Sequence, residues 1–219
     1  MDVAPAGEVN SDREALKKQI RDNHPNVYLT LVSIIVALAL EDLLSLVREI
    51  YRVGEPEAIT VLLWLQIVGA FSAAFATWVG YCHILITTRW ILGIWDALSV
   101  MTLLVTLFLI NSFVGAESPA WWFSALGAQS IAGGIILYVN MRRASMEPGI
   151  IHDAMPAPNS WPVYHLILSG ALILLFALLV SLDLVSDFVA LLLTASAIFF
   201  IVSWAFLWVH AWRKSVGIS

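Results

Sequence analysis

The sequence predicts an all-α, polytopic integral membrane protein with six transmembrane helices and both termini in the cytoplasm. Of the 219 residues, 60% are apolar and only 12% are charged, and the mean hydropathy is +0.87. Soluble domains carry about 25% charged residues, so this chain lacks the charge needed to cover a surface that faces water. Its apolar residues also gather into six stretches, each long enough to cross a bilayer.

The transmembrane domain is predicted to cover residues 27–212. A spanning helix needs about 20 mostly apolar residues, and the second stretch is long enough to tilt. The predicted spans are 27–47, 58–87, 91–115, 120–141, 163–182 and 188–212.

Two of the connections carry helix-start signals, and one is long. Glu117-Ser118-Pro119 predicts an N-cap followed by proline at the first helical position, and Ser186-Asp187 predicts a similar start for the sixth span. The connection over residues 142–162 contains four prolines. Proline fixes φ and donates no backbone hydrogen bond, so we expect an extended loop there.

The two ends of the chain are polar tails. Residues 1–26 carry acidic and basic side chains throughout and show no signal-peptide pattern. We expect either a solvated cytoplasmic tail or a short amphipathic helix on the membrane surface. Residues 213–219 are expected to form the cytoplasmic C-terminal tail.

Orientation follows from the distribution of Lys and Arg, which accumulate in cytoplasmic loops. Only Arg48 and Arg52 fall on the side opposite the N-terminus, whereas the other nine of the eleven basic residues share its side. The predicted location is a bacterial inner membrane with both termini inside. The nine residues are Arg13, Lys17, Lys18, Arg21, Arg89, Arg142, Arg143, Arg213 and Lys214.

Composition and motifs exclude several function classes. The net charge of -5 disfavours a surface that binds nucleic acid. The single cysteine, Cys82, cannot form an internal disulfide or a cysteine-rich metal site. Nucleophile-elbow, zinc-protease and phosphate-loop motifs are absent, so the sequence favours a protein that is not an enzyme. The expected partners are the lipid bilayer and further copies of the same chain.

An acidic pair, Glu41-Asp42, interrupts the first span about two-thirds of the way across, in its outer half. Each ionised carboxylate at mid-membrane costs roughly 2.5–3.5 kcal/mol on insertion scales, so Glu41 and Asp42 require protein or water nearby. Helical spacing places Ser33, Ala37, Glu41, Ser45 and Arg48 on one stripe, with Asp42 turned by about 100° from Glu41.

Two interpretations of the acidic pair are open. In the first, Glu41 and Asp42 bind a cation or proton on a transport path, together with Ser33 and Ser45 of the stripe. In the second, the helix ends early and both acids lie at the outer headgroups beside Arg48. Candidates for the rest of the path are Gln66, Thr77, Ser99 and Asn111. Span two also has small residues at heptad spacing, which we expect to serve helix packing.

A second polar group lies near the predicted cytoplasmic side. His83, His165 and His210 end or begin spans there, and Asp96 lies at a similar depth. Such a set could hold a metal or haem. Local pairs such as His-x-x-x-His are absent, however, and histidines also collect at membrane interfaces for ordinary packing. A contact between His83 and Asp96, as a hydrogen-bonded pair or proton relay, is the one we expect.

Three functions therefore compete at this stage. The leading hypothesis is a small channel or transporter for a cation or proton, working as a homo-oligomer and needing no cofactor. The second is a membrane redox or metal protein that uses the inner-side histidines. The third is a scaffold or assembly subunit whose small-residue helix faces dock a partner.

Overall fold

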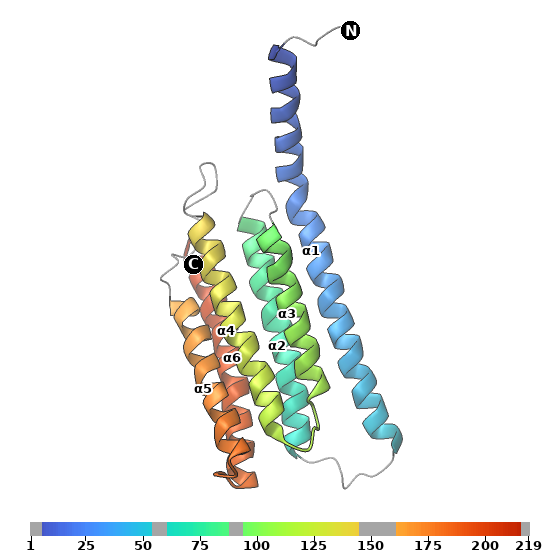
Figure 1. Cartoon of the computed structure of the whole chain (residues 1–219), viewed down its shortest axis with the longest axis vertical. Helices are drawn as coiled ribbons and strands as arrows, with labels where there is room; N and C mark the ends of the chain where they lie inside the picture. The colour runs from blue at the N-terminus through green and yellow to red at the C-terminus, as the bar shows by residue number, and fades with distance from the viewer. Residues whose placement is uncertain (1–5, 54–60, 88–93, 145–160, 216–219) are drawn as a thin grey trace.

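The computed structural model describes residues 6–53, 61–87, 94–144 and 161–215, and these residues form six helices. All six are long and apolar enough to cross a membrane, which confirms the predicted helical class and the six spans (Figure 1). The helices are α1 (Ala6–Val53), α2 (Val61–Thr87), α3 (Ile94–Ser112), α4 (Pro119–Ala144), α5 (Trp161–Ser181) and α6 (Asp187–Ser215).

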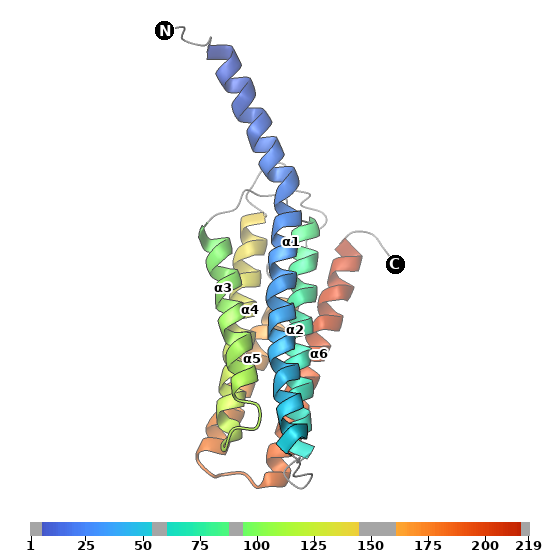
Figure 2. The ribbon, with the colours of Figure 1, turned by 90° about the vertical axis from the view of Figure 1, so that its right-hand side faces the viewer.

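Five of the helices form a closed ring. Each helix from α2 to α6 contacts the next one along the chain, and α6 returns to contact α2. The first helix lies outside this ring, against α2 and α3 (Figures 1 and 2). The start of α1 and the end of α6 lie at the same end of the bundle.

Helix α1 is continuous through the acidic pair. It runs over 48 residues, about 70 Å at 1.5 Å per residue, and its membrane-length apolar segment is Asn26–Ile50. Its N-terminal part extends beyond the ends of the other helices and is bent away from the direction of the part beside them (Figure 2), so residues 6–26 of the expected tail belong to the same helix. Because α1 continues to Val53, the structure has no helix end at Glu41 and Asp42.

Helix α3 ends three residues before the predicted boundary. Gly115 has a φ of 74°, a left-handed conformation that favours glycine. A turn precedes α4 and is held by two backbone hydrogen bonds, from Val114 N to Asn111 O and from Ala116 N to Phe113 O. Helix α4 then begins at Pro119, and the Ser118 hydroxyl accepts a bond of 3.4 Å from Ala120 N. The predicted cap and proline start are confirmed.

The end of α5 forms a Schellman motif. Asp183 has a φ of 52°, and the backbone bonds Leu184 N to Leu179 O and Asp183 N to Val180 O are both 3.1 Å. These bonds give hydrogen-bond partners to carbonyl oxygens that would otherwise have none at the end of the helix. Helix α6 starts soon after, at Asp187, as the Ser186-Asp187 signal predicted.

Glycines let the helices of the ring approach closely. A Cβ placed on Gly170 of α5 would lie 2.9 Å from the carbonyl oxygen of Gly127 on α4, and 2.7 Å from Ile131 Cγ1. Gly69 and Gly80 of α2 likewise lie under Trp122 and Trp204. Membrane helices associate through such close contacts because burial from lipid supplies no hydrophobic drive.

Gly170→Val should destabilise the protein because the new side chain would push α4 and α5 apart. We expect the free energy of unfolding in detergent to fall by about 2 kcal/mol or more, as for other overpacked cores. The measurement is chemical or thermal unfolding followed by tryptophan fluorescence. Ala171→Val is the matched control, since Ala171 is exposed; equal stability of the two variants would contradict the close-contact explanation.

Candidate functional site

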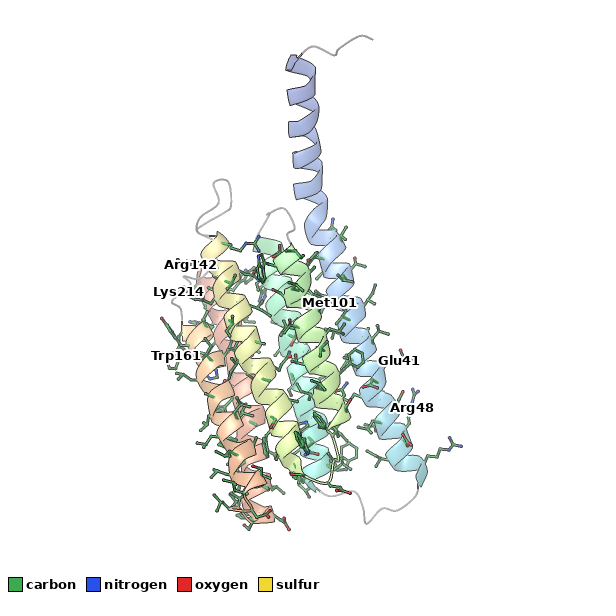
Figure 3. The ribbon with its side chains drawn as sticks, in the orientation of Figure 1. Glu41, Arg48, Met101, Arg142, Trp161 and Lys214 are labelled. Atoms are coloured by element: carbon green, nitrogen blue, oxygen red, sulfur yellow. The ribbon has the colours of Figure 1, made fainter. Side chains whose placement is uncertain are left out.

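The acidic pair lies outside the helix ring, on α1. Glu41 is exposed and extends from the side of α1 that faces away from the other helices, near the middle of the bundle's length (Figure 3). Arg48 extends from the same side, nearer the end of α1 (Figure 3). Within the part of the chain that the structure describes, the Glu41 carboxylate has no hydrogen-bond or ion-pair partner.

The exposed residues around Glu41 are a mixture of polar, small and large apolar side chains. We call them the outward face of α1. At helical steps of three or four, this face consists of the exposed residues Thr30, Ile34, Ala37, Leu38, Glu41, Leu44, Ser45 and Arg48.

Other helices also expose large apolar side chains. Where α2, α5 and α6 are exposed in the middle of their length, such residues form most of the surface, as lipid contact favours. These include Val68, Phe71 and Phe75 of α2, Leu168, Leu172, Leu175 and Leu178 of α5, and Leu192, Phe199, Val202 and Phe206 of α6.

Asp42 faces a different neighbour from Glu41. Asn111, buried at the end of α3, donates from Nδ2 to Asp42 Oδ2 at 3.3 Å and to the Ala39 carbonyl at 2.7 Å. The two carboxylates lie about 100° apart around the helix, as predicted. Asp42 therefore has an amide partner, whereas Glu41 has none among the described residues. The amide of Asn111 also ties α1 to the helix ring.

The other residues predicted for the α1 stripe and the path are dispersed. Ser33 accepts a bond of 3.3 Å from Trp78 Nε1, and Ser45 is exposed on the outward face of α1. Gln66 is buried, and its Oε1 accepts from Gly115 N at 2.9 Å, which holds the turn after α3. The Ser99 hydroxyl donates to the Trp95 carbonyl of its own helix at 2.7 Å.

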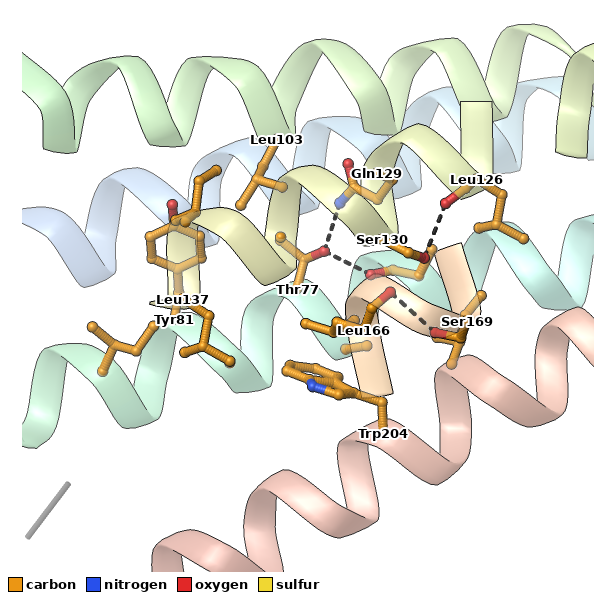
Figure 4. Close-up of a pocket in the computed structure, with 17 residues that line it drawn as sticks. Thr77, Tyr81, Leu103, Leu126, Gln129, Ser130, Leu137, Leu166, Ser169 and Trp204 are labelled. Atoms are coloured by element: carbon orange, nitrogen blue, oxygen red, sulfur yellow. Dashed lines mark hydrogen bonds between the residues drawn. The ribbon is translucent and has the colours of Figure 1, made fainter. Parts of the chain in front are cut away.

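Thr77 lines a cavity inside the ring, with a volume of about 70 Å³ (Figure 4). The wall is mostly apolar and comes from all five ring helices, including Leu103 of α3 and Trp204 of α6. Thr77, Gln129, Ser130 and Ser169 add polar groups, and the cavity is large enough to hold water. No part of α1 lines this cavity, so it is a separate place from Glu41.

Gln129 joins three helices beside the cavity. Its Nε2 donates to Thr77 Oγ1 of α2 at 3.0 Å (Figure 4), and its Oε1 accepts from the Thr106 hydroxyl of α3. The Thr77 hydroxyl in turn donates to the Ala73 carbonyl at 2.8 Å. Sequence reasoning missed Gln129, although an amide in the middle of span four is the same kind of signal as Gln66.

The inner-side residues have several different neighbours. Asp96 is buried and forms an ion pair with Arg143 of α4, at 2.9 Å between Oδ1 and Nη1. His83 stacks on Trp212 with 4.5 Å between ring centroids, and His165 Nε2 lies 3.2 Å from Ser203 Oγ. His210 is exposed.

A metal site is not assembled by these side chains. Among the described residues there is no group of three or more His, Cys, Asp or Glu side chains placed to hold a metal ion. The contacts described above join Asp96 to Arg143 and His83 to Trp212, so the expected pair of His83 with Asp96 stays a prediction. From the sequence, Arg143 was interpreted only as a positive charge in a loop. Its pairing with Asp96 was not predicted, because the two residues lie 47 positions apart in the chain.

The comparisons with known proteins found no match: no family model, no curated protein and no solved structure is similar to this chain. The candidate site is therefore argued from the geometry of this chain alone.

The ion pair between Asp96 and Arg143 should stabilise the end of the ring where α3 begins and α4 ends. Bonds to charged groups contribute about 1.5–3 kcal/mol, and Arg143 is partly exposed, so we expect a coupling energy near the low end. A double-mutant cycle with Asp96→Asn and Arg143→Gln, read by unfolding in detergent, measures it. The same cycle with the neighbouring Arg142→Gln is the control; equal coupling in both would contradict a specific pair.

Proposed function

We propose that this protein is a small membrane channel or transporter that moves a cation or a proton, with Glu41 as the binding group. The observation that carries the proposal is a carboxylate within the apolar segment Asn26–Ile50 of α1, exposed on the outward face of that helix and without a partner among the described residues. Ionisable groups inside membranes are costly and mark ion paths or proton relays.

The chemistry of an unpartnered carboxylate supports a cation or proton as the cargo. In a poorly solvated place the ionised form needs a positive charge or water beside it, and the neutral form needs a bound proton. A carboxyl group that is stable only with a positive charge, water or a proton beside it exchanges one for another as its surroundings change. Asp42, which already accepts from Asn111, is proposed to assist by attracting the ion.

Charge at the outer end of the bundle supports the same cargo. Negative side chains outnumber positive ones among the residues described there, and such a field concentrates cations near an entrance. Arg48 and Arg52 are opposed there by Glu49, Glu117, Asp183 and Asp187.

Two other functions remain as weaker proposals. A redox or metal protein would use His83, His165, His210 and Asp96, and a chromophore or stoichiometric metal in the purified protein would favour it. A scaffold subunit would dock a partner on its helix faces, and stable co-purification with another chain would favour that.

Glu41→Gln should reduce transport because it removes the charge and the exchangeable proton while keeping the size. We expect proton or alkali-cation flux into proteoliposomes to fall by at least about tenfold, which corresponds to about 1.4 kcal/mol of lost stabilisation. Fluorescent indicators of pH, sodium and potassium give the measurement.

Glu49→Gln is the matched control for the flux assay. It removes the same charge from the same helix, on an exposed residue nearer the end of α1, and should leave flux within about twofold. Equal flux from wild type and Glu41→Gln would remove Glu41 from the path. Absence of flux from correctly inserted wild-type protein would reject transport itself.

We also propose that both termini lie in the cytoplasm of a bacterium, in its inner membrane. Positive residues outnumber negative ones near that end of the spans, as in Arg142, Arg143, Arg213 and Lys214. A fluorescent protein fused after residue 219 should be bright in a bacterial host, and alkaline phosphatase should be inactive there. Phosphatase fused after residue 184 should be active; the reverse pattern would overturn the orientation.

A further inference from the structure

The cavity inside the ring has a buried hydrogen-bond donor in its wall that lacks a partner. Trp204 of α6 lines the cavity and is buried, and its Nε1 has no hydrogen-bond partner among the described residues (Figure 4). A buried donor left in this state costs free energy, and native proteins contain few of them. A molecule in the cavity that accepts a hydrogen bond from this indole would therefore be stabilised there.

Other polar groups of the wall supply both donors and acceptors. Ser130 and Ser169 each donate a proton to a carbonyl one turn back on their own helices, so their oxygens are left as acceptors. The amide nitrogen of Gln129 has two protons, and its bond to Thr77 Oγ1 uses one of them. The second proton of this amide is available to a molecule in the cavity.

The wall favours an uncharged molecule with a hydroxyl group. None of the residues that line the cavity, all of which lie in the described part of the chain, is Asp, Glu, His, Lys or Arg. An ion in the cavity would therefore have no opposite charge beside it, which is costly in an apolar place. A group that bonds to the donors and to the acceptors of this wall must itself accept and donate. The smallest organic group that does both is a hydroxyl.

The cavity is long and narrow. Its lining runs from Ala73 to Ile84 on α2 and from Leu126 to Leu137 on α4, in each case about 16 Å along the helix at 1.5 Å per residue. Its volume of about 70 Å³ is about half of the roughly 150 Å³ in which an engineered apolar cavity holds benzene. Because this small volume is spread over such a length, it suits an unbranched chain better than a ring.

We propose that this cavity binds a short, unbranched and uncharged alcohol. The hydroxyl oxygen of the alcohol has two lone pairs, which accept from the amide of Gln129 and the indole of Trp204, and its proton goes to the oxygen of Ser130 or Ser169. The carbon chain lies along the apolar side chains that form most of the wall. The site is independent of the proposed function, because no part of α1 lines the cavity.

Photolabelling of the full chain in detergent tests the site. The probe is a butanol that carries a diazirine on its third carbon, and the labelled residues are mapped by mass spectrometry. We expect label on Tyr81, which lines the cavity one turn from Thr77 and has a hydroxyl without a partner among the described residues. Excess 1-butanol should suppress this label, whereas the branched tert-butanol should not.

Two variants with matched controls connect the label to the cavity. Gln129→Leu removes one hydrogen bond at similar size, so the label on Tyr81 should fall by about fivefold or more. Gln66→Leu is its control, because Gln66 is also a buried amide but does not line the cavity. Ala73→Leu fills the cavity without removing the amide and should abolish the label, whereas the exposed Ala171→Leu should keep it.

Several results would overturn the proposal. These are label confined to residues that face lipid, equal label in wild type and Gln129→Leu, or equal competition by tert-butanol and 1-butanol. A crystal structure grown with 1-butanol that shows only water in the cavity would do the same. Glu41→Gln should be labelled like the wild type, so the alcohol site and the transport function are tested separately.

Discussion

Hydrocarbon offers no partner to a polar group, and this constraint governs the whole structure. Backbone groups meet it by forming helices, and several buried amide side chains meet it through bonds to a neighbouring element. Gln66 accepts from the Gly115 amide, Gln129 bridges Thr77 and Thr106, and Asn111 binds the Ala39 carbonyl and Asp42. Each of these amides also connects two or more elements, so the polar groups define which helices are neighbours.

The hydroxyl groups near the cavity show the same constraint at a smaller scale. Thr77, Ser130 and Ser169 each donate to a carbonyl four positions back on their own helix. Their hydroxyl protons are therefore not available to other acceptors. Their oxygens stay available only as acceptors. Glu41 contrasts with all of them because its neighbours on α1 supply no partner.

The sequence predicts the helices far better than their arrangement. Hydropathy reports where a segment can cross lipid, so the six spans and the start of α4 at Pro119 are confirmed. Hydropathy does not show in which direction a helix face points. Helical spacing groups Ala37, Glu41 and Ser45 on one face, but a helix that is apolar on all sides does not show whether that face points toward the other helices. The structure places it away from the ring.

Partners of single residues are also hidden from the sequence. Ser99 and Gln66 have the polarity of path-lining residues, yet each is satisfied locally, by the Trp95 carbonyl and the Gly115 amide. Asp96 pairs with Arg143 because α3 and α4 are neighbours in the ring. The partners of Gln66 and Asp96 do not follow from periodicity, since they depend on how one helix is rotated against another, whereas Ser99 bonds within its own helix.

The closed ring also has a consequence for the order of assembly during synthesis. Its larger contacts join consecutive helices except for one, between α6 and α2. The helices α2 to α5 precede α6 in the chain, so they can associate before α6 closes the ring. Until α6 packs against α2, the polar wall of Thr77 and Gln129 is a groove rather than a cavity, and Gly80 is not yet covered by the indole of Trp204. The packing of α6, and not that of an earlier helix, completes the interior of the ring.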